Sequence, residues 1–179
     1  MADTRRRLST PITPADTPDI GVELVEPLPK VVLHADGRMV GQALTNILKN
    51  AGEAVAARRA IAPKPEDGQR RGVSARLEVE DGFATFIIED DGVGLPARDR
   101  DRLTEPYVTT REKGTGLGLA IVKRICEEHG GELKLADAET LAGARVCLIF
   151  PLKSQPKPTG AAGTKDAPAS RSRAATAAE

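Results

Sequence analysis

Three glycines at alternate positions stand immediately before a segment that could be helical. They are Gly114, Gly116 and Gly118, in the run EKGTGLGLAI at residues 112–121. Glycine and threonine at the start of a helix leave backbone N–H groups unpaired at the positive end of the helix dipole, which suits a phosphate group. The run matches neither the dinucleotide-binding pattern, because residue 119 is leucine, nor a Walker A loop, because no Gly-Lys-Ser/Thr closes it. By itself it leaves phosphate binding and a plain sharp turn both open.

A pair of asparagines four residues apart is the second candidate for chemistry. Asn46 and Asn50 lie in residues 36–60, where apolar residues recur at three- and four-residue spacing as on one face of a helix. We expect Asn46, Asn50 and Glu53 together on the opposite side of that helix. Asparagine is a poor residue for a helix interior, whereas two amide oxygens on one surface suit Mg²⁺ with phosphate and water as its other ligands. A solvated polar face is the alternative. The apolar stripe comprises Val40, Leu44, Ile47, Leu48, Ala51 and Val55.

An aspartate at the end of an apolar run is the third candidate. Asp90 and Asp91 close the run FATFIIEDD at residues 83–91, and Gly92 and Gly94 follow. A carboxylate at a strand end can lie in a half-buried pocket while glycines let the chain bend away, although Asp and Gly also favour plain turns. A long loop leads from here to the glycine cluster, and a loop of about 20 residues in a compact domain is typically a functional lid or disordered.

The elements that must position these residues can be read from hydrophobic periodicity and turn residues. Asp36 is the predicted N-cap of the long helix, Asp81–Gly82 the turn of a hairpin, and Gly130–Gly131 the end of a second helix. We predict helices at 36–60 and 116–129, a short helical turn between 92 and 114, strands at 20–26, 73–81, 83–91, 131–139 and 144–152, and a short strand or extended entry at 30–36. The expected fold is α+β, a two-layer α/β sandwich with a mixed, mostly antiparallel sheet of about five strands and about three helices on one face.

Composition limits the function classes. Lys+Arg and Asp+Glu are 26 each, which argues against a general nucleic-acid binder, and an aromatic content of 2% removes stacking platforms for single strands. Cys126 and Cys147 have neither metal-ligand nor redox-pair spacing, so we expect reduced core cysteines in a cytoplasmic protein. No apolar run approaches the length that spans a bilayer, so we expect no direct membrane contact by this chain.

The two ends of the 179-residue chain differ from its middle. Residues 1–18 lack apolar periodicity and are predicted to be flexible. Residues 153–179 contain no large apolar residue and are predicted to be a disordered Ala/Pro-rich tail. The predicted folded domain is therefore 19–152.

Four segments together resemble the sequence boxes of the GHKL ATPases, and of sensor histidine kinases in particular. ALTNILKNAGEAV resembles the N box, DDGVGLP the G1 box, EPYVTT the F box, with Tyr107 where many members carry phenylalanine, and KGTGLGLAIVKRICEEHGGEL the G2 box and its helix. The wording EPYVTTREKGTGLGLAIV is typical of nitrogen-regulation, NtrY-like kinases. The resemblance implies a Bergerat-type ATP-binding fold with ATP and Mg²⁺ as cofactors.

The resemblance also implies a role for each matching residue. Asn50 matches the Mg²⁺ ligand, Asn46 its partner near the phosphates, and Asp90 the carboxylate that accepts from the adenine amino group. Leu117 would pack beneath the phosphate-binding glycines, and residues 95–115 would form the ATP lid. Arg111 and Lys113 join Asn46 and Asn50 as the expected catalytic residues. The expected nucleotide-binding residues are Asn46, Asn50, Glu53, Asp90, Gly92, Gly94, Leu95, Tyr107, Thr109, Thr110, Lys113, Gly114, Thr115, Gly116, Leu117 and Gly118.

The function that the resemblance implies is transfer of the γ-phosphoryl group of ATP to a histidine. In the resembled kinases this histidine lies on a separate dimerisation domain, and a response regulator is the next partner. His34 and His129 are the only histidines, and neither has the acceptor context, so we interpret both as structural. We expect the acceptor domain, and any oligomer formed through it, to be absent from this chain, either because the chain is a fragment or because it is a stand-alone module. The full-length family member is often anchored in the inner membrane.

Two other functions stay open. The first is a stand-alone GHKL ATPase or an anti-sigma-type protein-serine kinase. ATP-hydrolysing relatives carry a glutamate near position 46, where this chain has asparagine, so we expect little hydrolysis. Glu53 is then expected to make a helix-surface contact or to reach a lid cation. The second is a non-catalytic nucleotide-binding module that docks a kinase or response regulator.

Overall fold

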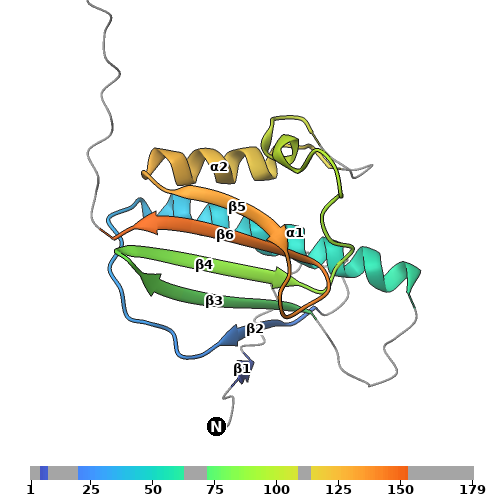
Figure 1. Cartoon of the computed structure of the whole chain (residues 1–179), viewed down its shortest axis with the longest axis horizontal. Coiled ribbons are helices and arrows are strands. Elements are labelled where there is room, and N and C mark those ends of the chain that lie inside the picture. Colours follow the sequence, from blue (N-terminus) through green and yellow to red (C-terminus); the bar gives the residue numbers. More distant parts are fainter. Residues whose placement is uncertain (1–4, 8–19, 63–71, 109–113, 153–179) are drawn as a thin grey trace, which may run out of the picture.

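The computed structural model describes residues 5–7 (backbone only), 20–62, 72–108 and 114–152. The predictions for most of 1–18, for much of the loop at 62–72 and for the tail at 153–179 concern residues outside these ranges. The described residues form a layer of helices on one side of a mixed sheet, as predicted (Figure 1).

Within the described ranges the sheet has six strands, in the order β1-β2-β3-β4-β6-β5. Among these six described strands, β2 and β3 pair in parallel, and the other neighbouring pairs are antiparallel. The sequence predicted no element in 1–18, so β1 is an addition to the expected sheet of about five strands. The strands are β1 (Arg5–Arg7), β2 (Val22–Val25), β3 (Val73–Glu80), β4 (Phe83–Asp90), β5 (Glu132–Asp137) and β6 (Ala144–Pro151).

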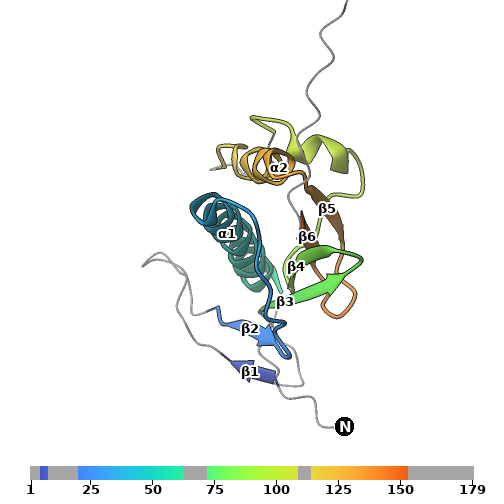
Figure 2. The ribbon, with the colours of Figure 1, turned by 90° about the vertical axis from the view of Figure 1, so that its left-hand side faces the viewer.

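In the described part of the chain, two α-helices lie on one side of the sheet (Figure 2). They are α1 (Gly37–Ile61) and α2 (Gly118–Glu128), and a 3₁₀-helix η1 (Arg100–Thr104) supplies the predicted short turn. Asp36 is the N-cap of α1 as expected, because its side chain accepts from the backbone N–H groups of Arg38 and Met39. No helix among the described residues combines the length and apolarity needed to span a bilayer.

The core fills the space between the helices and the sheet. In β6, Val146, Leu148 and Phe150 alternate toward the helices, and Ile47 and Val122 meet them from α1 and α2. Cys126 is a buried free thiol of this core, as predicted, and burial raises its pKa to about 12. Cys147, the other free cysteine, is half-buried.

The structure decides one open alternative of the sequence prediction and corrects one detail of it. The segment at 30–36 forms no strand. Asn46 and Asn50 do not lie opposite the apolar stripe of α1. Ala43 and Ala54 are buried as well, which widens the stripe toward the asparagines, so that Asn46 and Asn50 are half-buried at its border. Asn46 and Asn50 therefore lie beside the core and not in open solvent.

His129 joins the ends of the two helices. Its Nε2 accepts from the backbone N–H of Asp36 at 3.1 Å, and its Nδ1 lies 2.7 Å from the carbonyl oxygen of Ile125. The ring also packs edge-on against Phe150. These contacts support the structural interpretation of His129, while His34 is exposed in the segment before α1.

Candidate functional site

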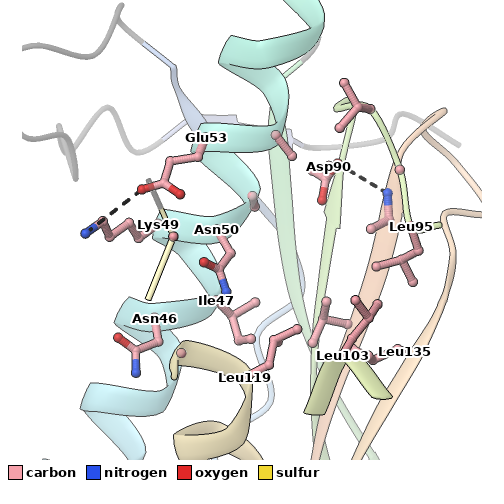
Figure 3. Close-up of a pocket in the computed structure, with 18 of the residues that line it drawn as sticks. Asn46, Ile47, Lys49, Asn50, Glu53, Asp90, Leu95, Leu103, Leu119 and Leu135 are labelled. Atoms are coloured by element: carbon pink, nitrogen blue, oxygen red, sulfur yellow. Dashed lines mark hydrogen bonds and ion pairs between the residues drawn. The ribbon is translucent and has the colours of Figure 1, made fainter. Parts of the chain in front are cut away.

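A cavity of about 600 Å³ lies between the two helices, the sheet and the segment that follows β4 (Figure 3). One wall is α1, the floor is apolar, and the G1 and G2 boxes lie at its edges. Of the expected site residues it is lined by Asn46, Asn50, Glu53, Asp90, Gly94, Leu95, Gly114, Thr115, Gly116 and Gly118. The structure thus gathers residues that are up to 72 positions apart in the chain.

The wall from α1 carries the polar side chains. Figure 3 shows Asn46, Asn50 and Glu53 on successive turns of this helix, with Lys49 between them. Glu53 pairs with Lys49 at 4.0 Å, which agrees with the expected helix-surface contact. Lys49 lines the cavity and was missed, although its helical position between Asn46 and Glu53 could have indicated it.

The start of α2 lies beside Asn50. A Cβ atom built on Gly118, the first residue of α2, would lie 3.6 Å from the amide nitrogen of Asn50. The N-terminus of α2 and the Asn50 amide therefore lie at the same end of the cavity. A helix N-terminus presents unpaired N–H groups and positive potential, so this end suits an anion.

Asp90 is buried at another part of the cavity edge and is held by backbone donors. The N–H groups of Gly92 and Ala144 both donate to its Oδ1, at 2.8 and 3.2 Å. The first of these donors belongs to the same box as Asp90, while the second comes from the start of β6. The carboxylate is thus fixed in direction by two different segments.

Gly92 does not line the cavity, and its role is close packing. A Cβ atom at residue 92 would lie 2.5 Å from the Cβ of Ala54, which no real side chain tolerates. Asp91 beside it is bound to α1, because Arg58 Nη1 lies 2.6 Å from its Oδ1. The G1 box is therefore attached to the last turns of α1.

The apolar floor was not predicted as part of the site. It consists mainly of residues that periodicity identifies only as core, and nothing in their spacing distinguishes core from floor. They are Ile47, Ile88, Leu103, Leu119, Leu135 and Val146. Such a floor suits a flat, largely apolar part of a ligand, which would displace water from it on binding.

Some expected binding residues lie away from the cavity or outside the described part of the chain. Tyr107 is 79% exposed and does not line the cavity, although its N–H donates to the carbonyl oxygen of Gly116. Leu117 is the N-cap of α2 and does not line the cavity either. Thr109, Thr110, Arg111 and Lys113 lie outside the described residues. Within those residues, no group of three or more His, Cys, Asp or Glu side chains could hold a metal ion.

Comparison with known proteins identifies the family. Residues 35–154 match the family described as histidine kinase-, DNA gyrase B-, and HSP90-like ATPases. The chain belongs to this family. The match confirms the resemblance found in the four boxes, and membership implies ATP binding.

Curated relatives of this ATPase domain include sensor kinases. The chain is 52% identical over 122 residues to nitrogen regulation protein NtrY of Azorhizobium caulinodans, covering 68% of this chain and 15% of NtrY. It is 32% identical over 123 residues to the signal transduction histidine-protein kinase AtoS of Escherichia coli, covering 69% of this chain and 18% of AtoS. The chain thus spans less than a fifth of the length of these relatives.

Solved structures confirm the fold. The ATP binding domain of PrrB from Mycobacterium tuberculosis superposes with a TM-score of 0.57 at 26% identity, covering 75% of this chain and 81% of that one. Full-length ShkA in complex with AMPPNP gives a TM-score of 0.56 at 30% identity, covering 73% of this chain and 24% of that one.

Proposed function

We propose that this domain binds ATP with Mg²⁺ and transfers the γ-phosphoryl group to a histidine on a separate dimerisation domain. The observation that carries the proposal is the composition of one cavity. It combines a fixed buried carboxylate, Asp90, with an anion-binding end formed by Asn50 and the start of α2. An apolar floor lies between the elements that carry these groups. This arrangement suits a nucleotide whose base lies over the floor, with its amino group at the carboxylate and its phosphates at the anion-binding end.

The residues divide into two groups by what they would contact. Asp90 would accept a hydrogen bond from the adenine amino group over the floor formed by Ile88 and its neighbours. Asn46 and Lys49 would lie near the phosphates, since both line the cavity from the turns of α1 around Asn50. The glycines at 114, 116 and 118 would let backbone N–H groups approach the phosphate oxygens.

The side chains present suit a magnesium ion that is bound together with a nucleotide. An amide oxygen is a hard ligand, and Mg²⁺ is commonly held by one or two protein oxygens together with phosphate and water. Asn50 is the residue that would hold it. When bound, the ion would neutralise charge on the phosphate oxygens, and this chain would contribute positioning and N–H donors, which dominate phosphoryl transfer.

The phosphate acceptor would come from a partner. His129 is committed to contacts between α1 and α2, and His34 is exposed outside the cavity. We therefore propose a histidine-bearing dimerisation domain as the first partner, through which any oligomer would form, and a response regulator as the second. A cytoplasmic location follows from the same proposal, because both ATP and such regulators are found there.

The test is phosphotransfer in trans. The chain is mixed with a purified histidine-bearing dimerisation domain and γ-labelled ATP, and acid-labile phosphate is measured on the partner with and without EDTA. We expect labelling that requires the chain and Mg²⁺. Rapid ATP hydrolysis by the chain alone would favour the stand-alone ATPase, and failure to bind a fluorescent ATP analogue would contradict the proposal.

A further inference from the structure

Glu89 is a fully buried carboxylate on the side of the sheet that faces away from the nucleotide cavity. Ile88 packs in the core beneath the helices, and successive residues of a strand point to opposite faces, so Glu89 points the other way. Its exposed fraction is 0%, although no helix covers this face among the described residues. A buried carboxylate needs hydrogen-bond donors or cations around it, and the segments that supply them show what Glu89 holds in place.

The hydrogen-bond donors of Glu89 come from the loop between β5 and β6, whereas Arg76 of β3 and Arg145 of β6 form ion pairs with it, each at 3.8 Å. The Thr140 hydroxyl and the backbone N–H groups of Glu139 and Thr140 all donate to its carboxylate, the two N–H groups at 3.2 and 3.4 Å. Burial alone would raise the pKa of Glu89, but these donors and the guanidinium of Arg76 outweigh it and hold the pKa below its usual value. Glu89 is therefore an ionised anchor for the loop.

The other end of the same loop holds Asp90. The N–H of Gly143 donates to the carbonyl oxygen of Asp90 at 3.0 Å, and the N–H of Ala144 donates to its Oδ1 at 3.2 Å. A Cβ atom at Gly143 would lie 2.2 Å from that Oδ1, so the approach requires glycine. Figure 1 shows the loop between β5 and β6 passing beside the end of β4. The loop thus links Glu89 and Asp90, which are adjacent in the chain and point to opposite faces.

We propose that Glu89 and Thr140 are positioning residues that set nucleotide base selection through Asp90. Glu89 fixes Thr140, the loop carries this constraint to Gly143 and Ala144, and their N–H groups orient the Asp90 carboxylate. The inference rests on the proposed function, in which Asp90 accepts from the adenine amino group. It adds Glu89 and Thr140, neither of which lines the cavity.

Thr140 offers the cleaner variant, because its side chain is exposed and a substitution there leaves the core unchanged. Thr140→Val removes the hydroxyl donor and keeps the branched shape, whereas Thr140→Ser keeps the donor. Thr85→Val is the matched control, since Thr85 lies on the same face of β4, four residues from Glu89. The full chain is used throughout, with circular dichroism to verify the fold.

The measurement is the affinity for ATP and for inosine triphosphate, by competition with a fluorescent ATP analogue. Inosine carries a carbonyl where adenine carries its amino group, so the ratio of the two dissociation constants reports the contact with Asp90. We expect Thr140→Val to weaken ATP binding about fivefold, the value of one hydrogen bond, while inosine triphosphate binding changes less than about twofold. Thr140→Ser and Thr85→Val should keep the ratio of the parent.

Two results would overturn the inference. One is an unchanged ratio in Thr140→Val, and the other is an equal loss for both nucleotides, which indicates a general structural effect. A parent chain that binds ATP and prefers it over inosine triphosphate supports the proposed function even if the ratio in Thr140→Val does not move. A parent that binds neither nucleotide would overturn the proposed function, and with it this inference.

Discussion

At the scale of single residues, Asp90 combines burial with directed backbone donors. One of its carboxylate oxygens, Oδ1, accepts from Gly92 and Ala144. Asparagine can keep its oxygen at the position of Oδ1, so Asp90→Asn should preserve both backbone hydrogen bonds and the local structure. Its amide nitrogen then takes the place of the other carboxylate oxygen. The variant would then have neither the negative charge nor the acceptor oxygen that would face the base, while its fold stays intact.

We therefore expect Asp90→Asn to weaken ATP binding by about 10- to 100-fold, the range for a hydrogen bond to a charged group, and to relax the preference for ATP over GTP. Competition titrations with both nucleotides measure this, and the unfolding temperature serves as the control for structure. Parent-like affinities for ATP and GTP would show that the adenine assignment is wrong.

Asn50 tests the magnesium assignment. Asn50→Ala places a better helix former at a half-buried position of α1, so the helix should remain intact. We expect the gain in ATP affinity that Mg²⁺ gives to the parent to disappear in the variant. Titrations with Mg²⁺ and with EDTA measure that gain, and Thr45→Ala on the exposed side of α1 is the control. A variant that still binds ATP more tightly with Mg²⁺ would contradict the assignment.

At the scale of elements, the ion pair of Arg58 with Asp91 attaches the end of β4 to the last turns of α1. The side chain of Asp91 is 11% exposed, so removal of Arg58 leaves a carboxylate in a largely dry position. We expect Arg58→Ala to lower the free energy of unfolding by about 1.5–3 kcal/mol, because this hydrogen bond involves charged groups.

The control for Arg58 is an exposed pair on the other helix. Arg124 pairs with Glu128 at 2.8 Å, and its side chain is 79% exposed. Arg124→Ala should therefore lower the free energy of unfolding much less than Arg58→Ala does. Urea unfolding of both variants gives the comparison. Equal losses would mean that the attachment of the G1 box to α1 contributes nothing specific to stability.

Elements defined by local signals could be predicted from the sequence. The β3–β4 hairpin was expected at 73–81 and 83–91 and is found at Val73–Glu80 and Phe83–Asp90, because its Asp81–Gly82 turn is a local feature. The segment at 30–36, predicted as a short strand or an extended entry, forms no strand. Periodicity could not decide between the two alternatives, because a strand needs a neighbouring strand to pair with.

Contacts between distant residues could not be predicted in the same way. The pair of Glu89 and Thr140 is separated by 51 positions, and neither residue belongs to a recognised box. The border position of Asn46 and Asn50 was also missed, because the prediction did not count the small residues Ala43 and Ala54 as part of the buried stripe. Small residues are weak signals of burial in a sequence, although they decide how closely elements approach.

At the scale of the whole molecule, Glu89 links the acid stability of the domain to the anchoring of the loop between β5 and β6. The pKa of Glu89 is below its usual value in the folded protein, because its donors and Arg76 outweigh the effect of burial. A carboxyl whose pKa is depressed by folding stabilises the protein above its unfolded-state pKa. That contribution is lost as the pH falls through the folded-state pKa.

Glu89→Gln is uncharged at every pH and cannot show this dependence. At neutral pH we expect the parent to have a higher free energy of unfolding than Glu89→Gln. This difference should shrink as the pH falls below about 4, because Glu89 is then protonated. Urea unfolding between about pH 3 and 7 measures it. Glu132→Gln, at an exposed pair with Lys134 in β5, should show almost no difference at any pH. A Glu89→Gln difference that stays constant down to the lowest pH would mean that the ionised carboxylate is not what anchors the loop.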